Sequence, residues 1–350
     1  MASYPIETIL TSIFMITVSV VAVLGNFLVI LAILWNRKLR TVCNFLFLNL
    51  AVADMLQGAI AMPLRLADQL NQTDNSPLVP CLVVIPLTVF LFGASNFNLT
   101  LISLDRYIAL RRPFIYPILA EPRRAALIVG MSWVLMSIIA FLPLMGWGAA
   151  ESADVADICL YSTTLSREYL FMLFSIVNLA VILILGFTNY FILKTARNQI
   201  RRIKVIEGPA TGSTVNLPSS VPMETESAMI VSNLPSTTDG DTVNRDPKRM
   251  PAKTRRSKER RATKIVLIVV GIFVFLTTPI TVIDIISLLG CPTCTPLTLV
   301  KITVFMAYAN ACVNVFIYAG FNTEMRNTWV SIFQSTKQAI WTRFSGEEAS

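Results

Sequence analysis

Side chains that could bind an ion stand inside stretches that are otherwise apolar. They are Asn26, Asp54, Ser95, Asn310 and Asn314. A polar side chain is costly in such a stretch, so each of these positions is expected to have a partner or a function. One carboxylate among amide and hydroxyl oxygens suits a monovalent cation, with Asp54 supplying the charge. Spacing alone leaves a second interpretation open, a hydrogen-bonded network that holds helices together.

A charged triplet, Asp105-Arg106-Tyr107, ends another long apolar stretch. Arg106 can pair with its neighbour Asp105, and the triplet would then be a solvated helix end. It can also pair with Glu259, an isolated acid in the basic segment RRSKERRATK. Because a half-exposed ion pair is weak, the second pairing would be a breakable tether between two helices, as a two-state element requires.

Membrane-spanning helices must position these residues. Hydrophobic residues make up 54% of the 350 and charged residues only 14%, whereas a soluble domain carries about a quarter charged residues. The net charge of +8 comes from gaps between apolar runs, so nucleic acid is not an expected partner. A spanning helix needs about 20 mainly apolar residues. Seven stretches qualify, at about 9–35, 43–66, 79–110, 124–147, 169–195, 262–289 and 297–320.

The distribution of Lys and Arg predicts the orientation. Basic residues cluster in the gaps after the first, third and fifth spans, as in Arg37-Lys38, Arg111-Arg112 and Arg201-Arg202, while the alternate gaps hold only Arg167. Basic loops stay on the cytoplasmic side. We therefore predict a multi-pass plasma-membrane protein with its N-terminus outside and its C-terminus inside.

Three further segments complete the predicted organisation. Residues 1–8 form a short extracellular N-terminus, and the Ser/Thr/Pro-rich segment at about 206–252 is typical of a disordered cytoplasmic loop. Residues 321–350 contain apolar residues at helical spacing. This pattern predicts a short amphipathic helix on the inner leaflet, held by Trp329 and Phe333 without a lipidated cysteine. The apolar residues are Met325, Trp329, Ile332 and Phe333, and Arg326 and Lys337 would face lipid headgroups.

Four cysteines fall on the predicted extracellular side. An oxidising compartment favours a disulfide between Cys81 and Cys159, and a small loop disulfide between Cys291 and Cys294 in CPTC. Asn71 begins the glycosylation sequon Asn71-Gln72-Thr73. The chain has no histidine and no visible pair of nucleophile and base, so we expect no enzymatic activity and no cofactor.

Together these motifs resemble those of rhodopsin-like G protein-coupled receptors. The matching positions are GNFLVI with Asn26, LNLAVAD with Asp54, Cys81, Asp105-Arg106-Tyr107, Trp133, Phe273, Pro279, and NVFIY with Asn314 and Tyr318. The resemblance implies an all-α seven-helix bundle that answers an extracellular ligand. Its partners would be a heterotrimeric G protein, arrestin and membrane lipid. It also implies that Arg106 leaves Glu259 in the active state and meets the G protein, helped by Tyr190 and Tyr318.

Two further implications of the resemblance concern bound groups. Asp54, Ser95, Asn310 and Asn314 match the family's sodium pocket. Within the family, FLPLMGW, CPTC and ANACVNVFIYA are similar to adenosine receptors, which implies adenosine or a related nucleoside as ligand. The corresponding ligand-binding positions are Thr88, Val89, Phe92, Tyr161, Ile280, Asp284 and Tyr308.

Several of these positions depart from the resemblance. Asp284 replaces an asparagine, so it can accept a hydrogen bond but not donate one. Tyr308 replaces a histidine, and Thr88 stands where amine receptors carry an aspartate. A peptide or lipid ligand, a non-signalling partner role and a transporter remain alternatives. The sixth-span tryptophan is Thr277, the last-motif proline is Val315, and the fifth span has no proline. These changes predict elevated basal signalling.

Overall fold

The structure is a computed structural model, and it describes residues 5–71, 81–150, 161–206, 252–289 and 294–347. Within these ranges the chain is helical apart from one isolated bridge between Ala149 and Leu165. Cys159, Cys291, most of the segment 206–252 and the side chains of Asn71 and Glu259 lie outside the described part of the chain.

Within the described ranges, seven helices are long and apolar enough to cross a membrane, which confirms the predicted all-α fold. The first is α1 (Ile6–Trp35), and the second consists of α2 (Val42–Leu56), η2 (Gln57–Ala61) and α3 (Met62–Asn71). The third is α4 (Cys81–Arg111), and the fourth is α6 (Pro122–Phe141) with η3 (Leu142–Met145). The last three are α8 (Arg167–Leu173) with η5 (Phe174–Leu179) and α9 (Ala180–Ile206), then α10 (Ala252–Leu288) and α11 (Leu297–Phe321).

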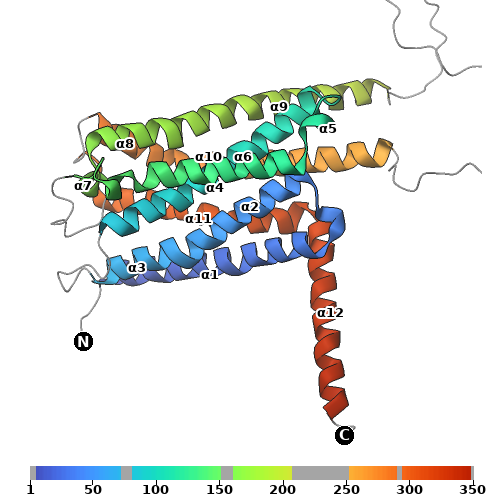
Figure 1. The fold of residues 1–350 in the computed structure, drawn as a ribbon, viewed down its shortest axis with the longest axis horizontal. Coiled ribbons are helices and arrows are strands. Elements are labelled where there is room, and N and C mark those ends of the chain that lie inside the picture. The colour runs from blue at the N-terminus through green and yellow to red at the C-terminus, as the bar shows by residue number, and fades with distance from the viewer. Residues whose placement is uncertain (1–4, 72–80, 151–160, 207–251, 290–293, 348–350) are drawn as a thin grey trace, which may run out of the picture.

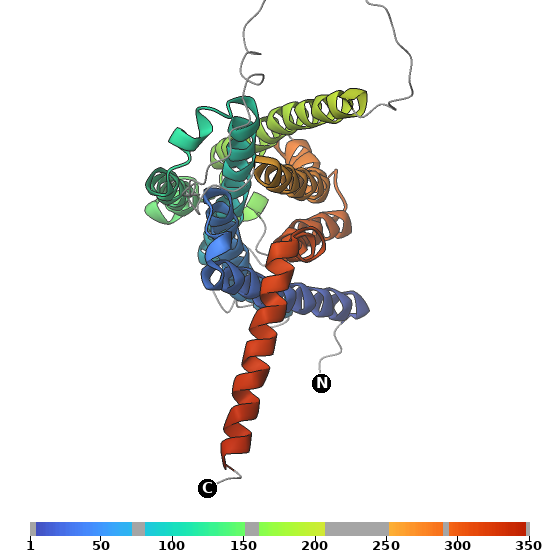
Figure 2. The ribbon, with the colours of Figure 1, turned by 90° about the vertical axis from the view of Figure 1, so that its right-hand side faces the viewer.

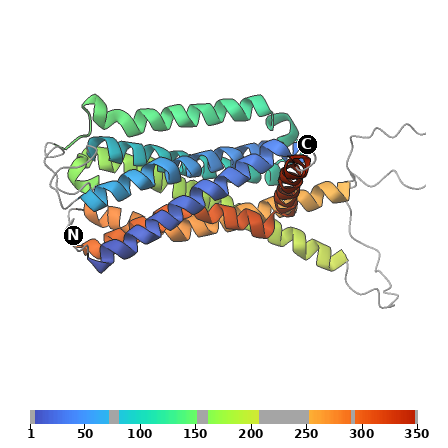
Figure 3. The same ribbon diagram turned by 90° about the horizontal axis from the view of Figure 1, so that it is seen from below.

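Helix α4 is the centre of the bundle, since it packs against α2, α6, α9 and α10. Its apolar residues occur all round the helix, as expected for a helix surrounded by others. Figures 1 and 3 show the helices running side by side, with the N-terminus and α7 (Tyr161–Thr164) at one end. The short helix α5 (Tyr116–Leu119) and α12 (Thr323–Glu347) lie at the opposite end.

Two of the spanning helices contain a π-helical turn. In the second span, η2 ends at Ala61, two residues before Pro63, whose missing amide hydrogen and ring disturb the regular α-helical ladder. In the fifth span, η5 forms without any proline. The fifth span therefore departs from a regular α-helix although it contains no proline. A π-turn is often found at functional sites, and η5 contributes to the cavity described below.

Two hydrogen bonds join the side chains of α2, α4 and α6 inside the bundle. The amide of Asn49 donates to Asn98 Oδ1, and Trp133 Nε1 donates to Asn49 Oδ1 over 3.0 Å. Buried amides need such partners. Asn98 therefore acts as a structural residue inside the bundle, although it also begins an Asn-Leu-Thr sequence of glycosylation type.

Gly25 permits close packing of α1 against α11. A Cβ atom at this position would lie 2.7 Å from Val315 Cγ2, so we expect Gly25→Ala to destabilise the protein by about 1–3 kcal/mol through overpacking. The melting temperature of the purified protein should fall by several degrees. In the double variant Gly25→Ala/Val315→Ala the clash is removed, and most of the loss should be recovered. An unchanged melting temperature in the single variant would show that α1 and α11 can move apart without loss of stability.

Helix α12 leaves the bundle sideways, as Figures 1 and 2 show. Met325 and Ile332 are buried against the bundle, and Trp329 packs on the same core cluster. Trp329 Nε1 also donates to the Leu28 carbonyl over 2.9 Å. Trp329 is thus attached to α1, whereas the sequence-based prediction placed it in lipid. Phe333 is 60% exposed, and α12 spans 25 residues, longer than the short helix predicted.

Candidate functional site

The seven predicted ligand-binding side chains line one cavity. They are Thr88, Val89, Phe92, Tyr161, Ile280, Asp284 and Tyr308. The cavity opens among α4, α7, α8, η5, α10 and α11, at the end of the bundle that holds the N-terminus. Its empty volume, including the open mouth, is about 950 Å³.

A short loop structure places α7 over this cavity. Gly148 has φ +96°, a conformation that L side chains rarely adopt, and a Cβ atom there would collide with Tyr169 at 2.6 Å. The Gly148 carbonyl accepts from Ser166 N over 2.8 Å, and the Thr164 carbonyl accepts from Ala150 N over 3.0 Å. These contacts hold the first turn of α7 in place, so Tyr161 faces the cavity.

The cavity wall is mainly apolar, with a few polar groups. The Thr88 hydroxyl already donates to the Val84 carbonyl over 2.8 Å. Burial is the main cause that raises the pKa of Tyr161 above its usual range; Tyr308 and Asp284 raise it further, while Arg65 lowers it. Tyr161 therefore stays a neutral phenol at physiological pH. Asp284 makes no hydrogen bond or ion pair with any other described residue.

The structure adds lining residues that were not predicted. Asn178 and Ser287 bring two further polar groups, and Phe174 brings an aromatic ring. Ser287 lies one helical turn beyond Asp284, so helical spacing could have found it. Asn178 is a polar residue within an apolar span, the same signal that singled out Asp54. Its direction depends on the π-turn η5, which periodicity does not reveal.

Three of the five polar residues inside the spans are joined by direct hydrogen bonds. Ser95 Oγ donates to Asp54 Oδ1 over 2.7 Å, and Asn314 Nδ2 donates to Asp54 Oδ2 over 2.8 Å. Asp54 is fully buried. The two contacts join α2, α4 and α11 at a single carboxylate, which we call the Asp54 network.

The other two polar residues lie beside this network without a hydrogen bond to Asp54. Asn26 Nδ2 donates to the carbonyls of Ala22 and Ala311 over 2.8 and 2.9 Å. Its Oδ1 is buried and has no hydrogen-bond partner. Asn310 is buried as well. A buried amide oxygen without a partner is uncommon and suggests an unseen ion or water.

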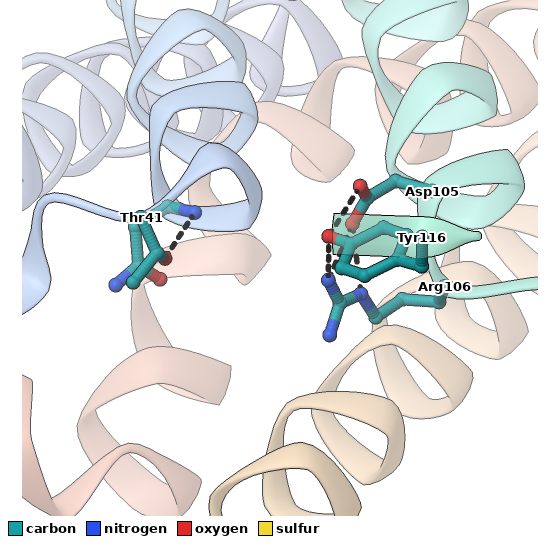
Figure 4. A network of polar contacts seen from close by, with 5 residues as sticks. Thr41, Asp105, Arg106 and Tyr116 are labelled. Atoms are coloured by element: carbon teal, nitrogen blue, oxygen red, sulfur yellow. Dashed lines mark hydrogen bonds and ion pairs between the residues drawn. The ribbon is translucent and has the colours of Figure 1, made fainter. Parts of the chain in front are cut away.

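Arg106 lies in a second polar group at the opposite end of the bundle, shown in Figure 4. Its Nη2 donates to Asp105 Oδ2 over 2.6 Å and to the Tyr116 hydroxyl over 2.8 Å. The Tyr116 hydroxyl donates in turn to Asp105 Oδ1 over 2.8 Å. Figure 4 places Thr41, which caps α2, apart from this group. We call Asp105, Arg106 and Tyr116 the arginine cluster.

Arg106 is buried and its two partners are partly buried, so Arg106 is not part of a solvated helix end. The Arg106 and Asp105 side chains are only 7% and 10% exposed. Burial is the main cause that raises the pKa of Tyr116; Arg106 lowers it and Asp105 raises it, so Tyr116 remains a neutral donor. No sequence signal identified Tyr116, because it belongs to the four-residue helix α5 between α4 and α6, which is too short to show a periodic pattern.

The remaining predicted switch residues are dispersed. Tyr107 contacts the rings of Phe187 and Phe191 on α9, each at a centroid distance of 6.0 Å. Tyr190 is 60% exposed on the outer surface, whereas Tyr318 is 1% exposed and packs against Phe47. The buried Tyr318 hydroxyl makes no hydrogen bond to the described residues. The predicted contact between Arg106 and Glu259 involves a side chain outside the described part of the chain.

The family model of seven-transmembrane receptors of the rhodopsin family matches residues 25–318. The chain belongs to this receptor family. Its members are receptors and not enzymes, they bind extracellular ligands and they act on G proteins. The chain is accordingly a multi-pass membrane receptor.

Similar receptors differ in the ligands that their names carry. The rat 5-hydroxytryptamine receptor 5B is 31% identical over 328 residues, covering 90% of this chain and 82% of the relative. The human adenosine receptor A2a is 28% identical over 336 residues, covering 91% and 71%. The guinea-pig histamine H2 receptor is 33% identical over 206 residues, covering 58% and 57%. Similarity to adenosine receptors is therefore one of several.

The cysteines of the receptor divide into two groups. Cys43 and Cys312 are the free cysteines of the described residues, and both are buried. The predicted partners of Cys81 and Cys294 lie outside the described part of the chain. The two disulfides and the glycosylation at Asn71 therefore stay predictions.

Proposed function

We propose that this receptor converts the binding of a small extracellular ligand into activation of a heterotrimeric G protein. The observation that carries the proposal is the arrangement of two sites at opposite ends of one bundle. A cavity of ligand size lies beside the N-terminus, and the arginine cluster lies at the other end. The distribution of Lys and Arg assigns the cavity to the outside and the arginine cluster to the cytoplasm of the plasma membrane.

The signal is a shift between two populations of the bundle. A ligand moves this equilibrium only by its difference in affinity for the two states. In the resting arrangement Arg106 is held by Asp105 and Tyr116. Outward movement of α10 would open the cytoplasmic end and let the guanidinium meet the G protein. Glu259, at the start of the sixth span, would compete for Arg106 until that movement occurs. Arrestin would use the same open end.

The residues around Asp54 fit a sodium ion, which would act as an allosteric ligand. Asp54 supplies the negative charge, Ser95 a hydroxyl oxygen and Asn310 an amide oxygen close to the network. The unpartnered Oδ1 of Asn26 supports a missing group in this region. A bound cation would hold α2, α4 and α11 together, since the Asp54 network already joins these helices.

Two ligand classes fit the proposal. The resemblance noted in the sequence favours adenosine or a related nucleoside, whose ring would stack on Tyr161 and whose exocyclic amine would donate to Asp284. The second class is an amine, favoured by the lone carboxylate of Asp284 in the cavity and by the amine receptors among the relatives.

A ligand panel tests the proposed function. Nucleosides, biogenic amines, lipids and short peptides would be applied to cells expressing the receptor with several G proteins, and second-messenger output would be measured per surface receptor. We expect at least one small ligand to raise output above that of an Arg106→Ala control. A signalling role would be contradicted if no ligand class raised second-messenger output and if basal output equalled that of the Arg106→Ala control. Solute flux in proteoliposomes would then favour a transporter.

A further inference from the structure

Asp284 is the one charged side chain among the described residues that line the cavity. It comes from α10, and it is partly buried. The other polar lining residues are neutral: Thr88, Tyr161, Asn178, Ser287 and Tyr308. None of these side chains, nor any other described residue, forms an ion pair or hydrogen bond with the Asp284 carboxylate.

Three cations are described at this end of the bundle, and one of them, Arg167, is exposed at the start of α8. Arg65 Nη1 lies 3.3 Å from Asp68 Oδ2 on the same helix, and Arg65 has a further contact as well. Lys301 Nζ lies 3.3 Å from Glu7 Oε1. None of the three cations lines the cavity. The protein therefore leaves the negative charge of Asp284 uncompensated in a wall that is mainly apolar.

A carboxylate without a partner in such a place is unfavourable, because it has lost part of its hydration without gaining a compensating charge. A neutral N–H donor restores one ordinary hydrogen bond. A protonated amine restores a hydrogen bond to an ionised acceptor, which is shorter and about twice as strong as a neutral one. The chemistry of the cavity thus favours a cationic ligand over a neutral one.

We propose that the ligand of this receptor carries a protonated amine that pairs with Asp284. The inference rests on the proposed function and specifies its ligand class. The counter-ion then comes from the sixth span, while the third span contributes the neutral Thr88, whose hydroxyl is already bonded to Val84. The apolar wall, with Val89 and Phe92 on α4, receives the ring or alkyl part of the ligand. Tyr161 on α7 covers it.

The first test compares ligands that differ in charge. The probes are 5-hydroxytryptamine, histamine and octopamine as cations, adenosine as a neutral nucleoside, and 5′-amino-5′-deoxyadenosine as its cationic counterpart. We expect cationic probes to activate the receptor and the aminonucleoside to be more potent than adenosine. Asp284→Asn, which keeps size but removes charge, should reduce the potency of cationic probes about 100-fold. Asp284→Glu should recover part of it, and Glu168→Gln, which neutralises an exposed acid outside the cavity lining, should have little effect.

The second test needs no signalling. Because Asp284 is unpaired in the empty receptor, Asp284→Asn is expected to raise the melting temperature of the ligand-free protein, whereas removing a paired carboxylate would lower it. Cationic probes should raise the melting temperature of the wild-type protein but not that of Asp284→Asn. The proposal is overturned if Asp284→Asn is less stable than wild type. It is equally overturned if adenosine activates both proteins alike, or if no cationic probe stabilises the wild type.

The experiments distinguish a wrong ligand class from a wrong signalling role. If the receptor signals above the Arg106→Ala control but answers only neutral ligands, the cationic ligand class is wrong and the proposed function stands. If cationic probes bind in the melting assay and no G protein responds, the ligand class stands and the proposed signalling role fails.

Discussion

Arg106→Ala is expected to reduce nucleotide exchange on the G protein to the level of membranes without receptor, with or without agonist. In the structure the guanidinium makes two bonds to Asp105 and one to Tyr116. It is the one buried cation among the described residues, so it is the cation that opening of the cytoplasmic end would newly expose. The measurement is GTPγS binding to purified G protein, normalised to receptor at the cell surface.

The control for this experiment addresses folding. Removing Arg106 alone leaves the Asp105 carboxylate buried without its cation, which costs about 3–5 kcal/mol. The double variant Asp105→Asn/Arg106→Ala avoids this penalty and should fold normally while remaining inactive. Exchange activity in a well-folded double variant would show that Arg106 does not act on the G protein.

Tyr116→Phe tests whether Tyr116 restrains Arg106 in the inactive receptor. Arg106 itself would still be able to contact the G protein in this variant. The variant loses one bond from Arg106 and one to Asp105, and hydrogen bonds to charged groups contribute about 1.5–3 kcal/mol. Agonist-independent exchange should therefore rise about tenfold or more, the opposite direction to Arg106→Ala. Because the pKa of Tyr116 is raised by burial, its phenol does not ionise between pH 6 and 9, and this part of the cluster should be insensitive to pH there.

The unliganded receptor is expected to signal well above an Arg106→Ala control. Thr277 is buried where the family resemblance places a tryptophan, and its hydroxyl bonds only to Phe273 of its own helix, over 2.8 Å. Val315 stands where the resemblance places a proline, and it packs against Gly25. With neither a bulky side chain at position 277 nor a proline at position 315, fewer contacts oppose movement of α10. Basal second messenger in transfected cells, per surface receptor, is the readout.

A matched pair of variants tests the role of Thr277. Thr277→Trp should lower basal output several-fold, because the larger side chain would contact neighbouring helices. Thr278→Trp adds the same group at the adjacent exposed position, whose hydroxyl also bonds within the helix. It should leave basal output unchanged. Equal effects of the two variants, or a wild type no more active than Arg106→Ala, would refute the expectation of high basal activity.

Much of the fold could be predicted because the signals involved are local. Each of the seven spans is recognisable from length and hydropathy alone, since in lipid a helix satisfies its own backbone. The same rule made polar residues in the spans conspicuous, and Asp54, Ser95 and Asn314 prove to be direct partners. The seven cavity positions were predicted from the family resemblance, because matching positions in related receptors lie at the same depth in the membrane and on the same face of the helix.

The misplaced details depend on contacts between distant segments. Trp329 has helical spacing suited to lipid, yet it reaches the Leu28 carbonyl on α1, a partner 301 residues away in the sequence. Tyr116 begins the four-residue helix α5, which is too short to show a periodic pattern, so nothing local indicated its bonds to Asp105 and Arg106. The π-turn η5 arises without proline and reorients the residues that follow it.

The sequence by itself therefore determined that the chain lies in a lipid bilayer, how many times it spans the bilayer and which orientation is expected. It also determined which types of side chain are available. These properties can be predicted because hydropathy and charge act on each segment separately. The tertiary structure decided which of those side chains have partners. It shows that Arg106 is buried with Asp105 and Tyr116, and that Asp284 faces the cavity without any partner among the described residues. Pairing is a property of the packed bundle, since it requires groups from separate segments to lie within hydrogen-bonding distance.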